Sequence, residues 1–319
     1  MRKIPQPSFV RRGLSALTTL LVLGLPGGLA AQGTAAAPAP TVTILDGGAV
    51  LLRGAGRLQV AEGVRLAPQD IVETAADAKL LRVEFPDGLA LSLGPGTRVM
   101  LDPRLAGEKG RAARVYLLRG WFKLNAAPAP AAPPGKPAAP PMPPLSSPGL
   151  DLLAASGSVV ALVQDTALQV FVESGEATLQ ERQAGAPSGA PQKLRSGEFL
   201  ARAGSGKSAI TPRAAGDFVQ QLPRSFLDTL PARAAMFGDR EVTPKPLGDI
   251  AYPEVQAWLG AEPALRRPAM PRWRALTRNP AFRNALVANM AAHPEWDRVL
   301  FPEKYLPKPA YPGAAAAPR

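Results

Sequence analysis

Short apolar runs separated by turn residues fill the middle of the chain. Apolar residues at 81, 83 and 85 alternate with Arg82 and Glu84, and Pro86-Asp87-Gly88 follows before the alternation resumes. A period of two is typical of β-strands, and aspartate and glycine tolerate the backbone angles of a tight turn. The pattern therefore predicts an antiparallel hairpin over residues 81–93.

The same strand pattern continues on both sides of residues 126–148, a stretch that is almost only alanine and proline. Such a stretch has too little apolar bulk to pack, so it predicts a surface insertion or a stiff spacer. Further strands are predicted at 97–101, 115–118, 121–124, 150–153, 158–163, 167–172, 177–181 and 193–201. Their number and spacing indicate a mostly β fold for residues 50–211.

Beyond residue 211 the apolar period lengthens to about four, which indicates helices. Residues 214–221 and 253–259 are predicted helices. A third is predicted to begin at Asn279, a good N-cap residue that precedes a proline at the first helical position. We therefore expect a small helical C-terminal region over 212–306, followed by a disordered tail over 307–319.

The N-terminus has the layout of a secretory signal peptide over residues 1–31. Four basic residues precede the apolar segment Leu14–Leu25, which is followed by small residues up to Ala31. The apolar segment is shorter than the roughly 20 residues that cross a bilayer as a helix. The pattern predicts export to the periplasm with cleavage near Ala31, a linker over 32–49, and no transmembrane span in the mature chain.

Composition limits the chemistry that the chain offers. It contains no cysteine and one histidine, which excludes disulfides and thiolate metal sites, and we expect no cofactor. The net charge of +12 falls to +8 once the four basic residues of the leader are removed. In an exported protein a basic balance favours anionic envelope polymers over nucleic acid, or serves solubility alone.

Two motifs and their surroundings resemble the FecR domain. The segment 66–74 contains Asp70 and Thr74 at the positions of the family's Gly-Asp-x-h-x-T element, and a hairpin centred on Asp87-Gly88 follows. Residues 118–122, around Gly120, and 170–177, around Gly175, resemble the family's strand-glycine-strand units. The chain departs from the family where Pro68-Gln69 replaces the glycine before Asp70, and at Gly157-Ser158, where Gly-Thr is usual.

The resemblance covers about residues 50–203 and implies a compact antiparallel β-sandwich of jelly-roll type in the periplasm. Well-known FecR proteins are envelope sensors in which a cytoplasmic segment and a membrane helix regulate a sigma factor. We expect this chain to be a stand-alone exported member that lacks those segments. Its motif residues are expected to be structural: Asp70, Thr74, Asp87, Gly88, Gly120 and Gly175.

No catalytic motif stands out. Residues 203–208 are similar to a phosphate-binding loop, but Ala201 occupies the position of its first glycine and no helical pattern follows. His293 follows a predicted helix, where a capping role is favoured over catalysis. Paired carboxylates of a glycan-cleaving enzyme leave no sequence signature. We therefore expect a non-enzymatic protein, with a glycan-acting envelope enzyme as the alternative.

A basic cluster in the helical region is the candidate partner-binding surface. Its members are Arg266, Arg267, Arg272, Trp273, Arg274 and Arg278. Arginine grips phosphate and carboxylate groups with two hydrogen bonds, and tryptophan stacks on sugars, so an anionic glycan or lipid headgroup would fit. The alternative is a solvated basic helix surface with Trp273 in the core.

The sequence thus predicts a periplasmic binding or scaffold module whose partner is unknown. An anionic envelope polymer and a periplasmic protein are both compatible with it. An accessory subunit in envelope signalling is a further alternative.

Overall fold

The computed structural model describes residues 39–106, 113–126, 142–165, 167–183, 185–238, 240 and 242–307. The predicted signal peptide, most of the alanine–proline insertion and most of the C-terminal tail lie outside these residues. Strands fill the first part of the described chain, in the order β1 (Thr41–Asp46), β2 (Ala49–Arg53), β3 (Gly56–Gln59), β4 (Ile71–Thr74), β5 (Leu80–Glu84), β6 (Ala90–Leu93), β7 (Arg98–Leu101) and β8 (Val115–Ala126).

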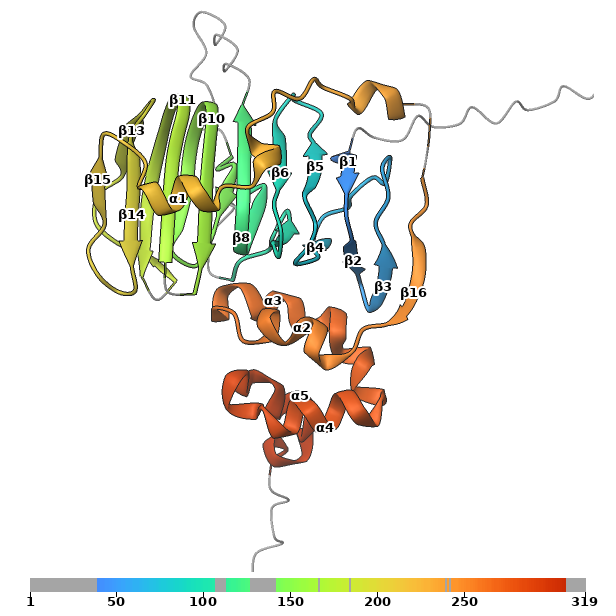
Figure 1. The fold of residues 1–319 in the computed structure, drawn as a ribbon. Coiled ribbons are helices and arrows are strands. Elements are labelled where there is room, and N and C mark those ends of the chain that lie inside the picture. The colour runs from blue at the N-terminus through green and yellow to red at the C-terminus, as the bar shows by residue number, and fades with distance from the viewer. Residues whose placement is uncertain are drawn as a thin grey trace, which may run out of the picture. The chain divides into compact units, whose positions relative to one another are not determined.

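More strands follow the insertion, and helices follow the strands (Figure 1). The strands are β9 (Leu145–Ser146), β10 (Leu150–Gln164), β11 (Ala167–Gln183), β12 (Ala186–Pro187), β13 (Gln192–Arg195), β14 (Phe199–Ala203), β15 (Ala209–Thr211) and, later, β16 (Lys245–Asp249). The α-helices are α1 (Gly216–Gln221), α2 (Tyr252–Leu259), α3 (Pro263–Trp273), α4 (Pro280–Ala288) and α5 (Asp297–Leu300). The 3-10 helices are η1 (Arg224–Phe226), η2 (Ala234–Phe237), η3 (Arg274–Arg278), η4 (Met290–Ala292), η5 (Pro294–Trp296) and η6 (Pro302–Tyr305).

The predicted fold class is confirmed: the chain is mostly β, with a small helical region at its C-terminal end. The predicted hairpin is present, because β5 and β6 pair antiparallel on either side of the turn at 86–88. Antiparallel pairing prevails, and the parallel contact between β8 and β9 is confined to one residue pair. The boundary predicted at residue 211 stays a prediction.

Strand β8 changes partners along its length and so divides the sheet into two layers. Its first half pairs with β7, whereas its second half pairs with β10 from Gly120 onward and with β6 from Phe122 onward. Gly120 lies at the change and has a φ of 114°. The first layer therefore comprises β3, β2, β4, β7 and the start of β8, and the second begins with β1, β5, β6 and the end of β8.

The two layers pack face to face over a shared apolar core. Leu51, Val72 and Val99 come from the first layer, and Val83 and Leu91 from the second, and all lie in one buried cluster. Alternate residues on each strand point away from this core. The outer faces of the layers are therefore available to the C-terminal segment and to ligands.

The C-terminal segment covers part of the second layer's outer face, including the polar positions of β5. Arg82 and Glu84 occupy the polar positions of its alternation, yet they are 6% and 5% exposed. Glu84 accepts hydrogen bonds from the backbone N–H groups of Arg233 and Ala234, and Arg82 donates to it. These bonds outweigh the cost of burial and lower the pKa of Glu84.

Helices α2 and α3 pack on the first layer, and α4 and α5 lie on their far side (Figure 1). A second buried cluster joins Leu52 and Ile71 of the outer face to residues of the helices, among them Trp258, Trp273 and Trp296. The predicted start of α4 is confirmed, because the Asn279 side chain accepts hydrogen bonds from the first-turn N–H groups. The helical region thus covers one end of the outer face and leaves the rest open.

The expected capping role of His293 is wrong. The imidazole is 1% exposed, and its Nε2 lies 3.1 Å from the Tyr252 hydroxyl, not at a helix-end carbonyl. Burial, reinforced by the nearby Arg266 and opposed by Glu295, lowers the pKa of His293 below its usual value. The helices close over His293, so its ring is buried and neutral. An imidazole that capped a helix end would instead be exposed and charged.

The burial of His293 makes the stability of the fold depend on pH, and a single NMR resonance can follow the titration of this residue. The chain has a single histidine, so its imidazole C2 proton is assigned at once. We expect it to titrate below the unfolded value of about 6.5. Because the folded pKa is the lower one, the stabilisation is complete above pH 6.5 and is lost as the pH falls to the folded pKa. A titration midpoint at or above 6.5 would contradict this placement of His293.

Candidate binding groove

A row of side chains crosses the open part of the first layer's outer face. The strand register aligns Lys245 with Gln59, Gln59 with Val50, Val50 with Glu73, Glu73 with Arg98, and Arg98 with Arg119. Directly opposed residues on antiparallel strands share a face, so these side chains form one line across β16, β3, β2, β4, β7 and β8. The line carries three cations and one carboxylate.

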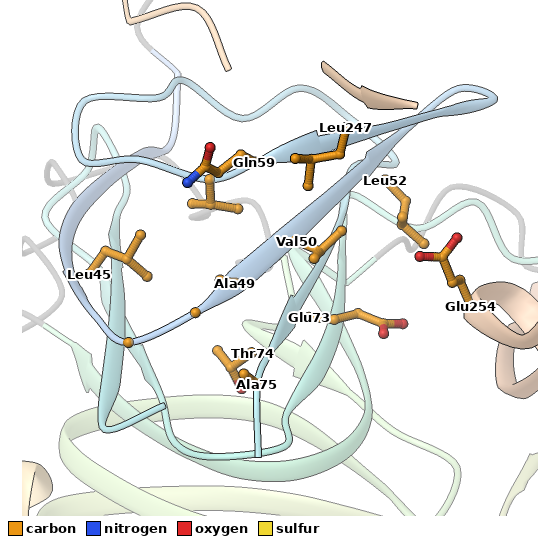
Figure 2. Close-up of a pocket in the computed structure, with 13 residues that line it drawn as sticks. Leu45, Ala49, Val50, Leu52, Gln59, Glu73, Thr74, Ala75, Leu247 and Glu254 are labelled. Atoms are coloured by element: carbon orange, nitrogen blue, oxygen red, sulfur yellow. The ribbon is translucent and has the colours of Figure 1, made fainter. Parts of the chain in front are cut away.

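One end of the row opens into a depression of about 480 Å³, shown in Figure 2. Its walls are mostly small or apolar and come from β2, from β16 through Leu247, and from the turn at Gly47 and Gly48. Leu247 is the bulged residue of β16, since the register shifts between Pro246 and Gly248. Two carboxylates, from Glu73 and Glu254, complete the lining.

Two further depressions continue the row. One of about 350 Å³ is lined by Gly96, Arg119 and Trp121 and reaches the end of β10 at Gln164 and Asp165. Another, of about 480 Å³, shares Gln164 and Asp165 with it and extends to Arg202. We call the row and the three depressions the outer groove. The first depression shares no lining residue with the other two, so a ligand that filled more than one of them would have to extend along the row.

Glu73 lies between Val50 and Arg98 in the charged row, and its carboxylate is contacted from two sides. Its Oε1 accepts a hydrogen bond from the indole N–H of Trp258 at 2.7 Å, and its Oε2 lies 3.3 Å from Arg98. Burial nevertheless outweighs these contacts, and the neighbouring Glu254 adds to it, so the pKa of Glu73 is raised. The carboxylate is therefore incompletely compensated and would gain from another cation.

Glu254 reaches the groove from the first turn of α2. Its Oε1 lies 2.5 Å from Arg57, and its Oε2 accepts the backbone N–H of Ala251 at 2.8 Å. The side chain is 29% exposed. It therefore both caps α2 and faces the first depression.

The predicted motif residues lie at turns and strand ends, and none of them belongs to the charged row. Asp70 is buried, is paired with Arg53 at 2.6 Å and accepts the Ala67 N–H. Thr74 donates to the Gly94 carbonyl and accepts from the Thr97 N–H. Both side chains tie a strand end to a neighbouring turn, and Thr74 also lines the first depression.

The remaining motif residues form turns and bends. Asp87 pairs with Arg114 and accepts the Leu89 N–H in the hairpin turn, where Gly88 has a φ of 86°. Gly175 faces Gly157 across β10 and β11, and both have positive φ. A side chain on Gly175 would lie 2.2 Å from the Ser156 carbonyl oxygen, so only glycine fits this bend.

The basic cluster does not form one surface. Arg266 is bonded to Glu295, and Arg272 donates to the carbonyls of Gln69 and Leu52. Trp273 is 0% exposed, which corrects its candidacy as a stacking platform. Arg267, Arg274 and Arg278 are exposed, and Arg267 lies 3.4 Å from Glu295. The partner-binding role of the exposed arginines stays a prediction.

Sequence reasoning missed the groove residues Glu73, Arg98, Arg119 and Glu254. Glu73 and Arg98 occupy polar positions of strands whose other face is apolar, and this alternation was the available signal. Glu254 comes from a helix far along the chain, so no local pattern could pair it with Glu73.

The described residues contain no cluster of three or more carboxylate or imidazole side chains arranged to hold a metal ion. Within the same ranges, no helix is long and apolar enough to cross a membrane.

No protein-family model matches the chain, and no curated protein matches it. Two crystal structures of candidate anti-sigma factors from Parabacteroides distasonis ATCC 8503 are similar to part of it. The first is 17% identical and the alignment covers 47% of this chain and 64% of that one, with a TM-score of 0.34. The second is 18% identical, with coverages of 43% and 57% and a TM-score of 0.30. The chain thus spans less than two thirds of either relative, and the FecR resemblance stays a prediction.

Proposed function

We propose that the chain is a non-enzymatic, FecR-type binding module of the periplasm, and that it holds an extended segment of a protein partner in the outer groove. The charged row across six strands is the observation that carries the proposal. Its polar side chains stand beside depressions that have both apolar and polar linings, and such a mixture suits an extended peptide. The signal-peptide pattern supports the compartment.

The bonds that the arginines of the basic cluster already make within the chain favour a protein partner over an anionic polymer. A polyanion needs a continuous surface of unpaired cations. Arg266 and Arg272 instead bond within the chain, and Glu73, Glu254 and Asp165 would repel a polyanion from the groove. A protein segment can match both signs of charge.

The two carboxylates of the first depression are the observation that favours a glycan-acting enzyme as a second candidate. Glycoside cleavage uses such a pair, one of them with a raised pKa. Here Glu254 is engaged by Arg57 and caps α2, and Glu73 is engaged by Trp258 and Arg98. Because neither is left free to transfer a proton, we prefer binding. Hydrolysis of purified peptidoglycan that disappears in Glu73→Gln would reverse this preference.

Site-specific photo-crosslinking in cells tests the proposed function. A photoreactive residue at Gln59 or Gln164, inside the groove, should capture a discrete protein, whereas one at Lys193 on β13 should not. Arg119→Glu should abolish capture because it reverses an exposed charge of the row. Arg195→Glu, an equally exposed change on β13, is the control and should leave capture intact.

Equal capture from Gln59 and Lys193 would contradict the proposal. So would salt-sensitive retention of the chain on peptidoglycan without any crosslinked protein, since this would indicate an anionic polymer as the partner.

A further inference from the structure

We infer that the partner segment carries a basic side chain that enters the first depression and, about three residues along, an acidic side chain that pairs with Arg119. The inference rests on the proposed function and specifies the chemistry of its ligand. It follows from the order of charges along the outer groove.

The first depression is built for a cation with an apolar stem. Val50, Leu52 and Leu247 supply apolar walls, and Glu73 and Glu254 supply negative charge. In Figure 2 both carboxylates project beside Leu52, from β4 and from α2. A lysine or arginine side chain has this combination of apolar stem and cationic end.

The charge balance at Glu73 also favours an added cation. Arg98 and Trp258 already contact the carboxylate, yet burial outweighs them and keeps its pKa raised. A guanidinium group brought by the ligand would add charge-assisted hydrogen bonds where compensation is incomplete.

The next two positions of the row have the opposite character. Arg98 and Arg119 stand side by side on β7 and β8, and Glu73 is the one carboxylate of the row that faces them. Arg119 is exposed, and no carboxylate of the described residues forms an ion pair with it. An anionic group of the ligand would be neutralised there.

Strand spacing sets the distance between the two ligand groups. Neighbouring strands lie about 4.8 Å apart, so Glu73 on β4 and Arg119 on β8 are separated by roughly 10 Å. An extended peptide advances about 3.3 Å per residue, so this separation corresponds to about three residues. The groove therefore selects a basic and an acidic residue three positions apart.

Trp258 offers a direct reporter of the cationic subsite, because its indole N–H donates to Glu73. Blocked arginine, added to the full-length chain, should shift the indole N–H resonance that is absent from Trp258→Phe. Blocked citrulline has the same shape without the charge and should leave that resonance in place. Glu73→Gln should abolish the response, while a thermal melt shows that the variant is folded. A shift of equal size with citrulline, or with blocked glutamate, would overturn the cationic subsite.

Two peptides test the spacing. A blocked hexapeptide with arginine at position two and glutamate at position five should bind about tenfold more tightly than the peptide with citrulline and glutamine there, because two charge-assisted contacts are lost. Moving the glutamate to position three should weaken binding similarly. The Arg119→Glu variant should prefer a lysine at position five.

The failures of the two proposals can be told apart. Equal affinity for all peptides, together with capture from Gln59 and Gln164 in cells, would overturn the charge pattern and leave the groove as a binding site. Absence of capture from both positions would overturn the proposed function itself.

Discussion

Gly120→Ala is expected to lower the free energy of unfolding by about 3–5 kcal/mol, which combines overpacking with a strained backbone. Gly120 has a φ of 114°, and a Cβ built there would lie 2.4 Å from the Cα of Thr97. Thr97 cannot retreat without cost, since its hydroxyl accepts from the Trp121 N–H and donates to the Trp121 carbonyl. Urea unfolding of the purified chain measures the loss.

Gly88→Ala is the matched control for this prediction. Gly88 also has a positive φ, of 86°, but nothing lies within 4 Å of a Cβ built there. We expect Gly88→Ala to lower the free energy of unfolding by about 1–2 kcal/mol, which is the cost of a positive φ in a residue with a Cβ. Equal losses for the two variants would show that the approach of Thr97 to Gly120 adds no cost beyond the strain of a positive φ.

The β-sheet was predictable because its signals are local. The alternation of apolar and polar residues over 81–93 and the turn at 86–88 can be recognised from consecutive residues, and the structure contains the predicted hairpin. The start of α4 at Asn279 is likewise a local signal and is present. Each of these elements depends on neighbours within about a dozen residues.

The elements that the sequence concealed depend on distant partners. Helix α3 contains Pro268 and Pro271, which normally break helices, yet its buried face packs against the first layer. The alternation of β5 does not show that Arg82 and Glu84 are buried, because the segment that covers them lies some 150 positions later. The groove has the same origin, because Glu254 meets Glu73 only through the fold.

Sequence composition does not show what a charged side chain contacts, and Arg272 of the basic cluster is an example. Arg272 donates to two backbone carbonyls of the β layer and lies over the ring of buried Trp273, at 5.3 Å. It therefore attaches α3 to the sheet. Guanidinium groups are well suited to such internal contacts because their donors spread in a plane.

A further contact that joins the helical region to the β layers is centred on Arg182 of β11, whose side chain is 1% exposed. Its guanidinium donates to Asp151 at 3.3 Å and to Glu262 at 3.2 Å. Glu262 immediately precedes α3 and also accepts the Tyr116 hydroxyl at 2.9 Å. Burial and the carboxylate of Glu262 raise the pKa of Tyr116 well above its usual value.

Arg182→Met is therefore expected to lower the free energy of unfolding by about 3–5 kcal/mol, because it leaves the carboxylates of Glu262 and Asp151 buried without their cation. Adding Glu262→Gln should recover part of the loss, since the amide is neutral and still accepts from Tyr116. Lys193→Met removes the exposed pair with Glu176 and should cost at most about 1 kcal/mol.

The double variant decides what the buried pair contributes. If Arg182→Met with Glu262→Gln is no more stable than Arg182→Met alone, the arginine acts through packing and not through charge. If the charge explanation holds, the unpaired carboxylate of Glu262 in Arg182→Met should also loosen α2, which is joined to α3 by three residues. The Trp258 indole resonance would then broaden in Arg182→Met and sharpen again in the double variant, because Trp258 is held to Glu73 only while α2 is seated on the first layer.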